Sequence, residues 1–300
     1  MQQVTVRVPA STSNLGPGFD CLGVALRIYK DVTVTPGSTL PLPTIASDAA
    51  KLFWQRARCR SLPFSVSMAG DIPRARGLGS SAAVRTGILF GLNQLCGSPL
   101  DQLSIFRLCA QIEGHPDNAA PAVFGGFNVI RASVVQHFPV SPRLKFVLLI
   151  PEVELKTSTA RKILPARVTR GAAVENCANA CAITAAFVSR QYEQLRGAFV
   201  DKLHQPFRAK LLTFLPRVIA AAEKAGALGA FLSGSGSTIC AVTLADAERI
   251  AAAMQRKISP PQNGFAVANN YAARVVITEA DNRGARVRSI RNPPSASRTL

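Results

Sequence analysis

The sequence PRARGLGSSAA, residues 73–83, decides the fold, because it puts a glycine-bearing turn between a predicted strand at residues 64–68 and a predicted helix at residues 80–95. Gly77 and Gly79 can adopt positive φ and let backbone N–H groups approach an anion. The N-terminus of the following helix adds partial positive charge at the same point. Ser80 and Ser81 can cap that helix, or one of them can bind a metal beside a phosphate. The stretch predicts a phosphate site, with a capped helix after a glycine turn as the alternative.

Around this junction the chain predicts a mixture of strands and helices. Alternating or continuous apolar runs predict strands at residues 4–8, 22–34, 123–130 and 145–150, and helices are expected at 48–58 and 100–113. After Pro151 we expect helices at 171–190, 207–225 and 245–257, and strands at 228–232, 238–243 and 272–278. We therefore predict an N-terminal domain over residues 1–150 and a C-terminal domain over residues 151–282. Residues 283–300 hold five arginines, two prolines and three serines, and are expected to form a disordered basic tail.

Composition excludes several classes of protein. Of 300 residues, 48% are hydrophobic and 17% charged, enough to bury a large core, and no apolar run reaches the roughly 18 residues of a membrane span. Seven cysteines and three histidines without a CxxC pair argue against zinc and disulfide frameworks. The net charge of +18 raises nucleic acid as a partner. The charge is spread along the chain and is not interleaved with aromatic residues, so an anionic small-molecule substrate is the better explanation.

Three further stretches gather polar groups. Residues 113–118, EGHPDN, place four polar or ionisable side chains in six residues, of which Glu113 suits Mg²⁺ and the others suit a small polar substrate. Residues 9–20, PASTSNLGPGFD, bracket a turn between Asn14 and Asp20. Residues 233–238, SGSGST, form a second glycine–serine turn between two predicted strands. Taken alone, each is an ordinary loop or a capped turn. The residue 73–83 loop matches neither GxxxxGK[ST] nor GxGxxG, which argues against a P-loop NTPase and a Rossmann site.

Together and in this order, these motifs resemble those of the GHMP small-molecule kinases, and within them the homoserine kinases. The resemblance rests on PASTSNLGPGFDCLGVAL at residues 9–26, GLGSSAA at 77–83, EGHPDNAAPAVFGGF at 113–127 and SGSGST at 233–238. Shorter similarities lie at 157–165 and 201–208. It implies an α+β fold in two domains, a ribosomal-S5-like N-terminal half and a ferredoxin-like C-terminal half with the site between them. It also implies transfer of the ATP γ-phosphoryl group to the hydroxyl of L-homoserine, in threonine biosynthesis.

The resemblance assigns roles residue by residue. ATP phosphates would lie against a loop of Pro73, Arg74, Ala75, Arg76, Gly77, Leu78, Gly79, Ser80, Ser81, Ala82 and Ala83. Mg²⁺ would lie at Ser81 and Glu113. L-homoserine would be surrounded by Asn14, Asp20, His115, Asp117, Asn118, Arg161 and Arg208, of which Asp117, Asn118 and Arg208 would be catalytic.

The chemistry of the substrate agrees with these roles. Homoserine carries an ammonium group for Asp20 and a carboxylate that the guanidinium of Arg161 or Arg208 can grip with two hydrogen bonds. Asp117 is a weak base candidate, because the lysine that some of these kinases pair with it is absent from residues 10–12. Positioning of the hydroxyl by Asn118 and Arg208 then suffices, since phosphoryl transfer depends mainly on alignment and charge stabilisation.

Some questions stay open at the level of sequence. The adenine-binding segment of the family is not recognisable between residues 36 and 63, and the high positive charge is not expected of the family. A kinase for another alcohol, such as mevalonate or a sugar, and a non-catalytic S5-like RNA-binding protein remain alternatives. We expect a cytoplasmic enzyme that acts on a small molecule, without a membrane or nucleic-acid partner, and with a homodimer as a candidate assembly.

Overall fold

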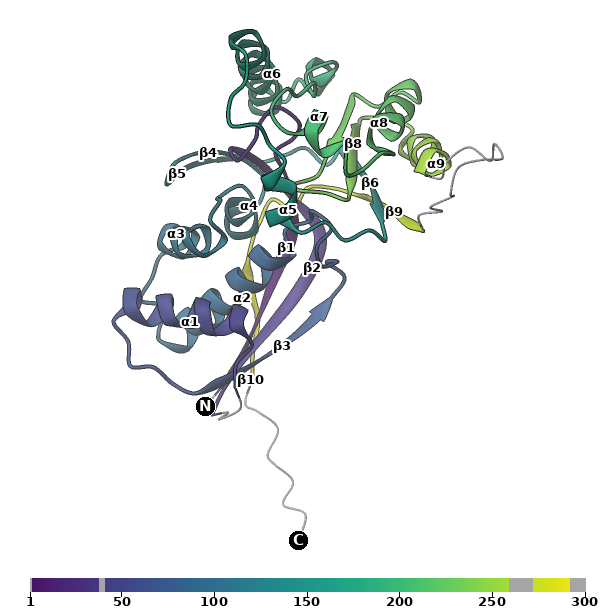
Figure 1. Ribbon diagram of the computed structural model, residues 1–300. Helices are drawn as coiled ribbons and strands as arrows, with labels where there is room; N and C mark the ends of the chain where they lie inside the picture. The colour runs from purple at the N-terminus through teal and green to yellow at the C-terminus, as the bar shows by residue number, and fades with distance from the viewer. Residues whose placement is uncertain (1, 38–40, 259–271, 292–300) are drawn as a thin grey trace.

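The first sheet of the computed structural model has six antiparallel strands; the structure describes residues 2–37, 41–258 and 272–291. The strand order is β10-β1-β2-β4-β5, with β3 also paired to β2. The strands are β1 (Gln3–Ser13), β2 (Leu22–Pro36), β3 (Phe64–Gly70), β4 (Phe127–Arg131), β5 (Val134–Phe138) and β10 (Arg286–Arg291). Figure 1 shows β1 and β2 running up from the N-terminal end towards the second sheet.

Four helices pack with this first sheet. They are α1 (Thr44–Ala57), α2 (Ser80–Leu95), α3 (Gln102–Glu113) and α4 (Ala119–Phe124). Val32 and Val34 of β2 share a buried cluster with Phe53, Ile88 and Phe106 from the helices. Gly87 and Gly91 let α2 lie directly on β2, since a Cβ at either glycine would come within 2.6 Å of Val32 or Val34.

The second sheet contains β6 (Lys145–Pro151), β7 (Gly229–Leu232), β8 (Ile239–Thr243) and β9 (Ala273–Thr278). Its order is β7-β8-β6-β9 and every pair is antiparallel. Helices α8 (Leu215–Lys224) and α9 (Ala247–Ile258) pack against it through a cluster that includes Val147, Val218 and Met254. This strand order, with helices after the first and third strands, is the ferredoxin-like arrangement. The predicted α+β architecture is confirmed.

Further helices lie between β6 and β7 of the second sheet, ahead of α8. They are α5 (Thr157–Lys162), α6 (Arg170–Ser189), the 3₁₀ helix η1 (Tyr192–Leu195) and α7 (Gln205–Arg208). By length and composition α6 is the one described helix that could span a membrane, and 22% of its most apolar 18-residue stretch is buried. It packs on the protein nonetheless, because Phe187 stacks on Phe127 at 4.3 Å and the Asn176 side chain donates to the Pro17 carbonyl.

The predicted disorder of the tail is wrong where the structure describes it. Residues 286–291 form β10, whose register pairs Thr5 with Ser289 and Arg7 with Arg286 along the edge of β1. Two of the arginines that suggested disorder form ion pairs with carboxylates: Arg288 lies 2.5 Å from Asp31 and Arg286 lies 3.3 Å from Asp281. Residues 292–300 lie outside the described residues.

Two predicted elements have different boundaries. The strand expected at 123–130 is the end of α4, followed by Gly125 and Gly126 at positive φ, and then β4. The helix expected at 207–225 is split into α7 and α8, and Pro216 lies in the first turn of α8, where its missing N–H costs nothing. Strand β5 and helix α5 were not predicted.

Candidate active site

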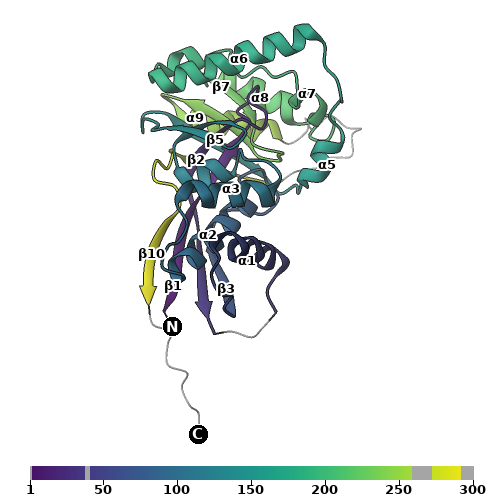
Figure 2. The ribbon, with the colours of Figure 1, turned by 90° about the vertical axis from the view of Figure 1, so that its left-hand side faces the viewer.

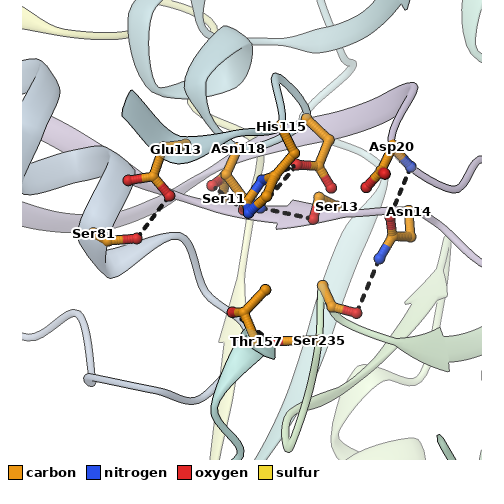
Figure 3. Close-up of polar contacts among 12 residues, drawn as sticks. Ser11, Ser13, Asn14, Asp20, Ser81, Glu113, His115, Asn118, Thr157 and Ser235 are labelled. Carbon is orange, nitrogen blue, oxygen red and sulfur yellow. Dashed lines mark hydrogen bonds and ion pairs between the residues drawn. The ribbon is translucent and has the colours of Figure 1, made fainter. Parts of the chain in front are cut away.

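A cavity of about 660 Å³ lies where the loop before α2, the end of β1, the α3–α4 turn, α5 and the β7–β8 turn meet. This volume suits a small-molecule site. Gly234 and Ser235 of the SGSGST motif line it. The predicted site residues in the lining are Asn14, Arg74, Ala75, Arg76, Gly77, Leu78, Gly79, Ser80, Ser81, Glu113, His115, Asp117, Asn118, Arg161 and Arg208. Figure 3 shows how these separate segments turn polar side chains towards one space.

The loop at residues 77–79 requires glycine at two positions. Gly77 has φ +73° and a Cβ there would lie 2.0 Å from the Ser233 carbonyl oxygen, while at Gly79, with φ +66°, it would lie 2.0 Å from the Ser11 hydroxyl. Gly79 also occupies the N-cap of α2, and no side chain caps this helix. The serines therefore do not cap α2. Ser80 and Ser81 in its first turn line the cavity, so the N-terminus of α2 lies where the predicted anion site requires it.

Ser81 and Glu113 meet as predicted. The Ser81 hydroxyl donates to the Glu113 carboxylate at 2.9 Å, although the two residues lie on different helices (Figure 3). Arg85, one turn after Ser81 on α2, forms an ion pair with the other Glu113 oxygen. Arg85 was not predicted as a site residue. Its spacing of four residues from Ser81 could have indicated it, because this spacing places both side chains on one face of the helix.

A second cluster surrounds Asp117. His115 Nδ1 lies 3.0 Å from the Asp117 carboxylate, and the Asn118 amide donates to Ser13 at 3.0 Å and accepts from Ser11 at 2.9 Å. Burial alone would raise the pKa of Asp117, but the hydrogen bond and charge of His115 outweigh it and leave that pKa below its usual range. Burial alone would lower the pKa of His115, but the hydrogen bond to Asp117 outweighs burial, so the pKa of His115 is raised. Asp117 is thus held as a carboxylate.

The third cluster holds opposite charges side by side. Arg161 Nη1 lies 3.0 Å from Asp20, and a second contact of 2.5 Å joins the same two groups. The Asn14 side chain accepts from the Asp20 backbone N–H at 3.0 Å and fixes this loop. The guanidinium carbons of Arg161 and Arg208 lie 5.2 and 5.4 Å from the centre of the Phe19 ring.

Arg208 is a buried cation, 1% exposed. Its Nε and Nη1 donate to the carbonyls of Ala160 at 3.2 Å and Gly234 at 2.9 Å, and Nη1 lies 3.2 Å from His204 Nδ1. Within the described part of the chain, no carboxylate comes within 4.0 Å of it. Burial lowers the pKa of Arg208 to about 10, and repulsion from Arg161 adds to this. It remains charged at neutral pH.

His204 and Asp201 hold Arg208 in place. The Asp201 carboxylate accepts from the backbone N–H groups of His204 at 3.0 Å and Gln205 at 2.6 Å, which fixes the start of α7. His204 Nε2 lies 2.8 Å from the Gly16 carbonyl oxygen. Burial lowers the pKa of His204 to about 4, with the Asp201 charge opposing. His204 is therefore neutral, with Nε2 as donor and Nδ1 left to accept from Arg208.

Not every predicted residue faces the cavity. Ala82 and Ala83 are fully buried in the α2 core, and Pro73 and Asp20 are outside the lining, although Asp20 contacts it through Arg161. Other residues were missed by sequence: Lys30, Ile45, Met68, Val84, Leu155, Lys156 and Thr157. Thr157 lies in a stretch noted for resemblance, whereas Lys30 and Met68 come to the cavity only through the pairing of β2 with β3.

Comparisons with known proteins agree on one family. The models of the GHMP kinases N terminal domain and the GHMP kinases C terminal match residues 44–126 and 184–259. Homoserine kinase of Caldicellulosiruptor bescii is 37% identical, covering 96% of this chain and 98% of the relative, and that of Moorella thermoacetica is 38% identical, covering 79% and 86%. The crystal structure of homoserine kinase from Cytophaga hutchinsonii has a TM-score of 0.85 at 25% identity, covering 95% of this chain and 97% of that one. A mevalonate kinase structure, at 14% identity and TM-score 0.67, shares the fold alone.

Proposed function

We infer that this chain, which belongs to the homoserine kinases of the GHMP kinase family, transfers the γ-phosphoryl group of ATP to the side-chain hydroxyl of L-homoserine and forms O-phospho-L-homoserine. The reaction feeds threonine biosynthesis. We expect it to take place in the cytoplasm, with small molecules as the partners of the site.

The observation that carries the substrate assignment is the unpaired charge of Arg208. Buried charges are costly unless they are paired, and among the described residues the hydrogen bonds of Arg208 reach only carbonyl oxygens and a neutral imidazole. A carboxylate from the substrate would supply the missing partner, in the two-pronged geometry that guanidinium favours. Arg208 therefore supports a carboxylate-bearing acceptor.

The neighbouring Asp20–Arg161 ion pair supports an acceptor that also carries an ammonium group. Both side chains are about one-third exposed, so a ligand can reach them. A zwitterion can exchange with such a pair, placing its ammonium on Asp20 and its carboxylate between Arg161 and Arg208. Mevalonate lacks the ammonium group and a sugar lacks both charges. The arrangement thus favours an amino acid over the other acceptors of this family.

ATP fits the opposite part of the cavity. The N-terminus of α2 and the glycine loop would hold the phosphates, and Arg74, Lys30 and Lys156 line the same cavity as cations. Ile45, Met68 and Val84 supply the apolar part of the lining, which suits the adenine ring. These assignments give the nucleotide one end of the cavity and the amino acid the other.

The residues present fit Mg²⁺ as a companion of ATP. A hydroxyl and a carboxylate at 2.9 Å are oxygen donors of the type Mg²⁺ prefers, and it completes its shell with phosphate oxygens and water. No group of three or more acidic, histidine or cysteine side chains suited to a metal occurs in the described ranges, in keeping with a metal that arrives with the nucleotide. When bound, Mg²⁺ neutralises charge on the transferring phosphoryl group. Glu113 and Ser81 would hold it.

The side chains of the site contribute to the reaction mainly by positioning the substrate. Asp117 is the carboxylate placed to accept the proton of the attacking hydroxyl, but its lowered pKa makes it a weak base. Asn118 fixes Asp117 through a 3.3 Å hydrogen bond, and Arg208 anchors the carboxylate at the other end of the substrate. Alignment of the hydroxyl with the γ-phosphorus is then the main contribution.

A panel of acceptors tests the assignment. ADP release is measured with Mg-ATP and L-homoserine, 4-hydroxybutyrate without the ammonium, 2-amino-1,4-butanediol without the carboxylate, mevalonate or galactose. We expect kcat/KM for L-homoserine to exceed that of each one-charge analogue by about 100-fold or more, since each leaves a buried or paired charge without a partner. Equal rates with galactose would remove the basis of the proposal.

The metal assignment has its own test. Ser81→Ala and Glu113→Gln should raise the Mg²⁺ concentration needed for half-maximal rate about tenfold at fixed ATP. Glu152→Gln, at an exposed carboxylate outside the cavity, is the control. An unchanged Mg²⁺ requirement in both variants would reject these two residues as ligands.

A further inference from the structure

A second cavity, of about 590 Å³, lies between α8 and α9, and we call it the α8–α9 groove. Figure 1 shows the two helices side by side, and Figure 2 shows them in the half of the molecule away from β10. The groove shares no lining residue with the active-site cavity. Its described lining holds five cationic residues, four alanines and no acidic residue: Arg217, Ala220, Ala221, Lys224, Ala225, Arg249, Ala253, Arg256 and Lys257.

The two helices run in opposite directions, which places the cations at the two ends of the groove. In the first turn of α9, Arg249 Nε and Nη2 donate to the Ala225 carbonyl at 3.0 and 2.7 Å. Ala225 directly follows the last residue of α8, so the start of α9 lies beside the end of α8. The five cations consequently form two groups, one at each end: Lys224 with Arg249, and Arg217 with Arg256 and Lys257.

The spacing of the two groups is the same on both helices. Lys224 follows Arg217 by seven residues on α8, and Arg256 follows Arg249 by seven residues on α9. Seven residues are two turns of helix, so the groups lie about 10 Å apart. The middle of the groove is apolar and shallow-walled, because only small side chains line it there: Ala220, Ala221 and Ala253.

The charge of the groove is scarcely compensated within the chain. Among the ion pairs of the described residues only one involves a groove cation, that of Arg249 with Asp246 at 3.7 Å. Both side chains of this pair are 64% exposed, so the pair neutralises little. All five cations belong to exposed residues, and Glu223 and Glu248 on the same helices lie outside the lining. An anionic partner would therefore find an uncompensated positive surface.

An acidic amphipathic helix matches both the charge and the shape of the groove. A helix laid along it with carboxylates at positions i and i+7 would place one carboxylate at each group of cations. Small apolar side chains at i+3 and i+4 would then face the alanines, which allow close approach of the backbones. A nucleic-acid strand fits less well, because its phosphates repeat without an apolar spacer and no aromatic residue in the described lining could stack on bases.

A second copy of this chain does not supply such a helix. No described helix contains more than one acidic residue, so none can present carboxylates at i and i+7. The chain also carries 35 basic and 17 acidic residues, so two copies would repel each other at this face. The occupant that the groove fits is consequently a helix of a different protein.

We propose that the α8–α9 groove docks an amphipathic helix of a partner protein, whose acidic residues lie seven positions apart with small apolar residues between them. The acidic residues would pair with the cations at the two ends, and the apolar residues would cover the alanines. Because the groove and the active-site cavity are separate, the docked helix would leave the cavity open.

A designed peptide tests the groove. The probe is a fluorescein-labelled helical peptide of about 20 residues, long enough to be helical in water, with glutamates at i and i+7 and alanine and leucine at i+3 and i+4. The control peptide has the same composition, with its glutamates moved to the opposite face. Fluorescence anisotropy at about 0.15 M NaCl should give a dissociation constant at least tenfold lower for the probe than for the control peptide.

Substitutions separate the contributions of charge and shape. Lys224→Glu combined with Arg256→Glu reverses one charge on each helix and should weaken probe binding about 30-fold. Arg56→Glu combined with Arg107→Glu makes the same change of net charge at exposed sites on α1 and α3, and should change binding less than about twofold. Ala253→Phe keeps every charge but fills the middle of the groove, and should weaken binding about tenfold. Circular dichroism and thermal melting confirm that each variant is folded.

Three results would overturn the proposal. One is equal affinity for the probe and the control peptide, which would reduce the binding to net charge. Another is probe binding that survives the combined Lys224→Glu and Arg256→Glu substitutions. The third is a fluorescein-labelled oligouridine RNA that binds more tightly than the probe and keeps its affinity in Ala253→Phe, which would assign the face to nucleic acid.

Discussion

At the scale of single residues, burial of the Arg208 charge lowers the stability of the fold and leaves a cation available to an anionic substrate. Its burial is a cost that the carbonyls of Ala160 and Gly234 only partly offset, since neutral acceptors do not neutralise a cation. The charge stays in place because His204 accepts from Arg208 and is itself held through Gly16. On the proposed function, the substrate carboxylate would supply the anionic partner that this buried cation lacks.

Replacing Arg208 by lysine keeps the charge and removes the planar fork. We expect Arg208→Lys to lower kcat/KM for L-homoserine about 100-fold, because two-pronged carboxylate binding is lost, with KM for ATP changed less than twofold. Steady-state kinetics for both substrates checks this, with Arg217→Lys on the exposed side of α8 as the matched control. A loss shared equally between ATP and homoserine would point to a structural role.

His204 makes a prediction about pH and stability. Burial lowers its folded-state pKa to about 4, against 6.5 in the unfolded chain, so the unfolded state binds the extra proton between these values. The free energy of unfolding contributed by neutral His204 is complete above pH 6.5 and falls as pH drops towards 4, by up to about 3 kcal/mol.

Urea titrations at pH 4.5 and 7 measure this contribution. His204→Gln should lose less stability over that range than the wild type, whereas His137→Gln, on the exposed side of β5, should behave like the wild type. If both variants keep the full pH dependence, burial does not suppress the charge of His204.

At the scale of elements, the glycine loop at residues 77–79 and the β7–β8 turn form one unit. The Ser233 hydroxyl donates to the Gly77 carbonyl at 2.7 Å, and the Thr238 N–H donates to the Arg76 carbonyl at 3.2 Å. Two glycine-rich loops far apart in the chain thus contact each other directly in the wall of the cavity. Each taken alone looked like an ordinary turn.

Gly77→Ala should separate these turns. Its Cβ would strike the Ser233 carbonyl, so we expect KM for ATP to rise at least tenfold. Gly97→Ala is a close control, because Gly97 has a similar φ of +78° but no heavy atom within 4 Å of the added Cβ. Both variants carry the strain of a positive φ, and only the first carries the clash. Equal nucleotide affinity in the two variants, measured by titration calorimetry, would contradict the loop assignment.

Strand β10 makes a separate prediction. A chain ending at Ala285 should melt several degrees below a chain ending at Arg291, because it exposes the edge of β1 and removes the ion pairs of Arg286 and Arg288. Differential scanning calorimetry of the two truncations makes the comparison. The same Tm in both would show that β10 adds nothing to the sheet.

At the scale of the whole molecule, the sequence predicted the elements and motifs but not how they meet. Helix α2 was predicted with its observed bounds because its glycine turn and apolar length are local signals. The ion pair of Asp20 with Arg161 and the place of Met68 in the cavity depend on residues far apart in the chain, so no local pattern reveals them. The tail was mispredicted because composition argues for disorder while an open edge of β1 supplies backbone partners.

Both sheets position residues of the cavity. The first brings the glycine loop, Glu113 and Asp117, and the segments around the second bring Arg161, Arg208 and the Ser233 turn to the same cavity. On the proposed assignment, the first half binds the phosphate donor and both halves together bind the amino-acid acceptor. The central claim is that these two ligands meet in this one cavity.

Phosphorus-31 NMR of the wild-type protein with Mg-ATP and L-homoserine tests this claim most directly. We predict that the γ-phosphate signal of ATP is replaced, in equal amount to ADP, by a phosphomonoester signal split by the protons of the homoserine side-chain CH₂–O group. Release of inorganic phosphate alone, or no loss of ATP, would contradict the account.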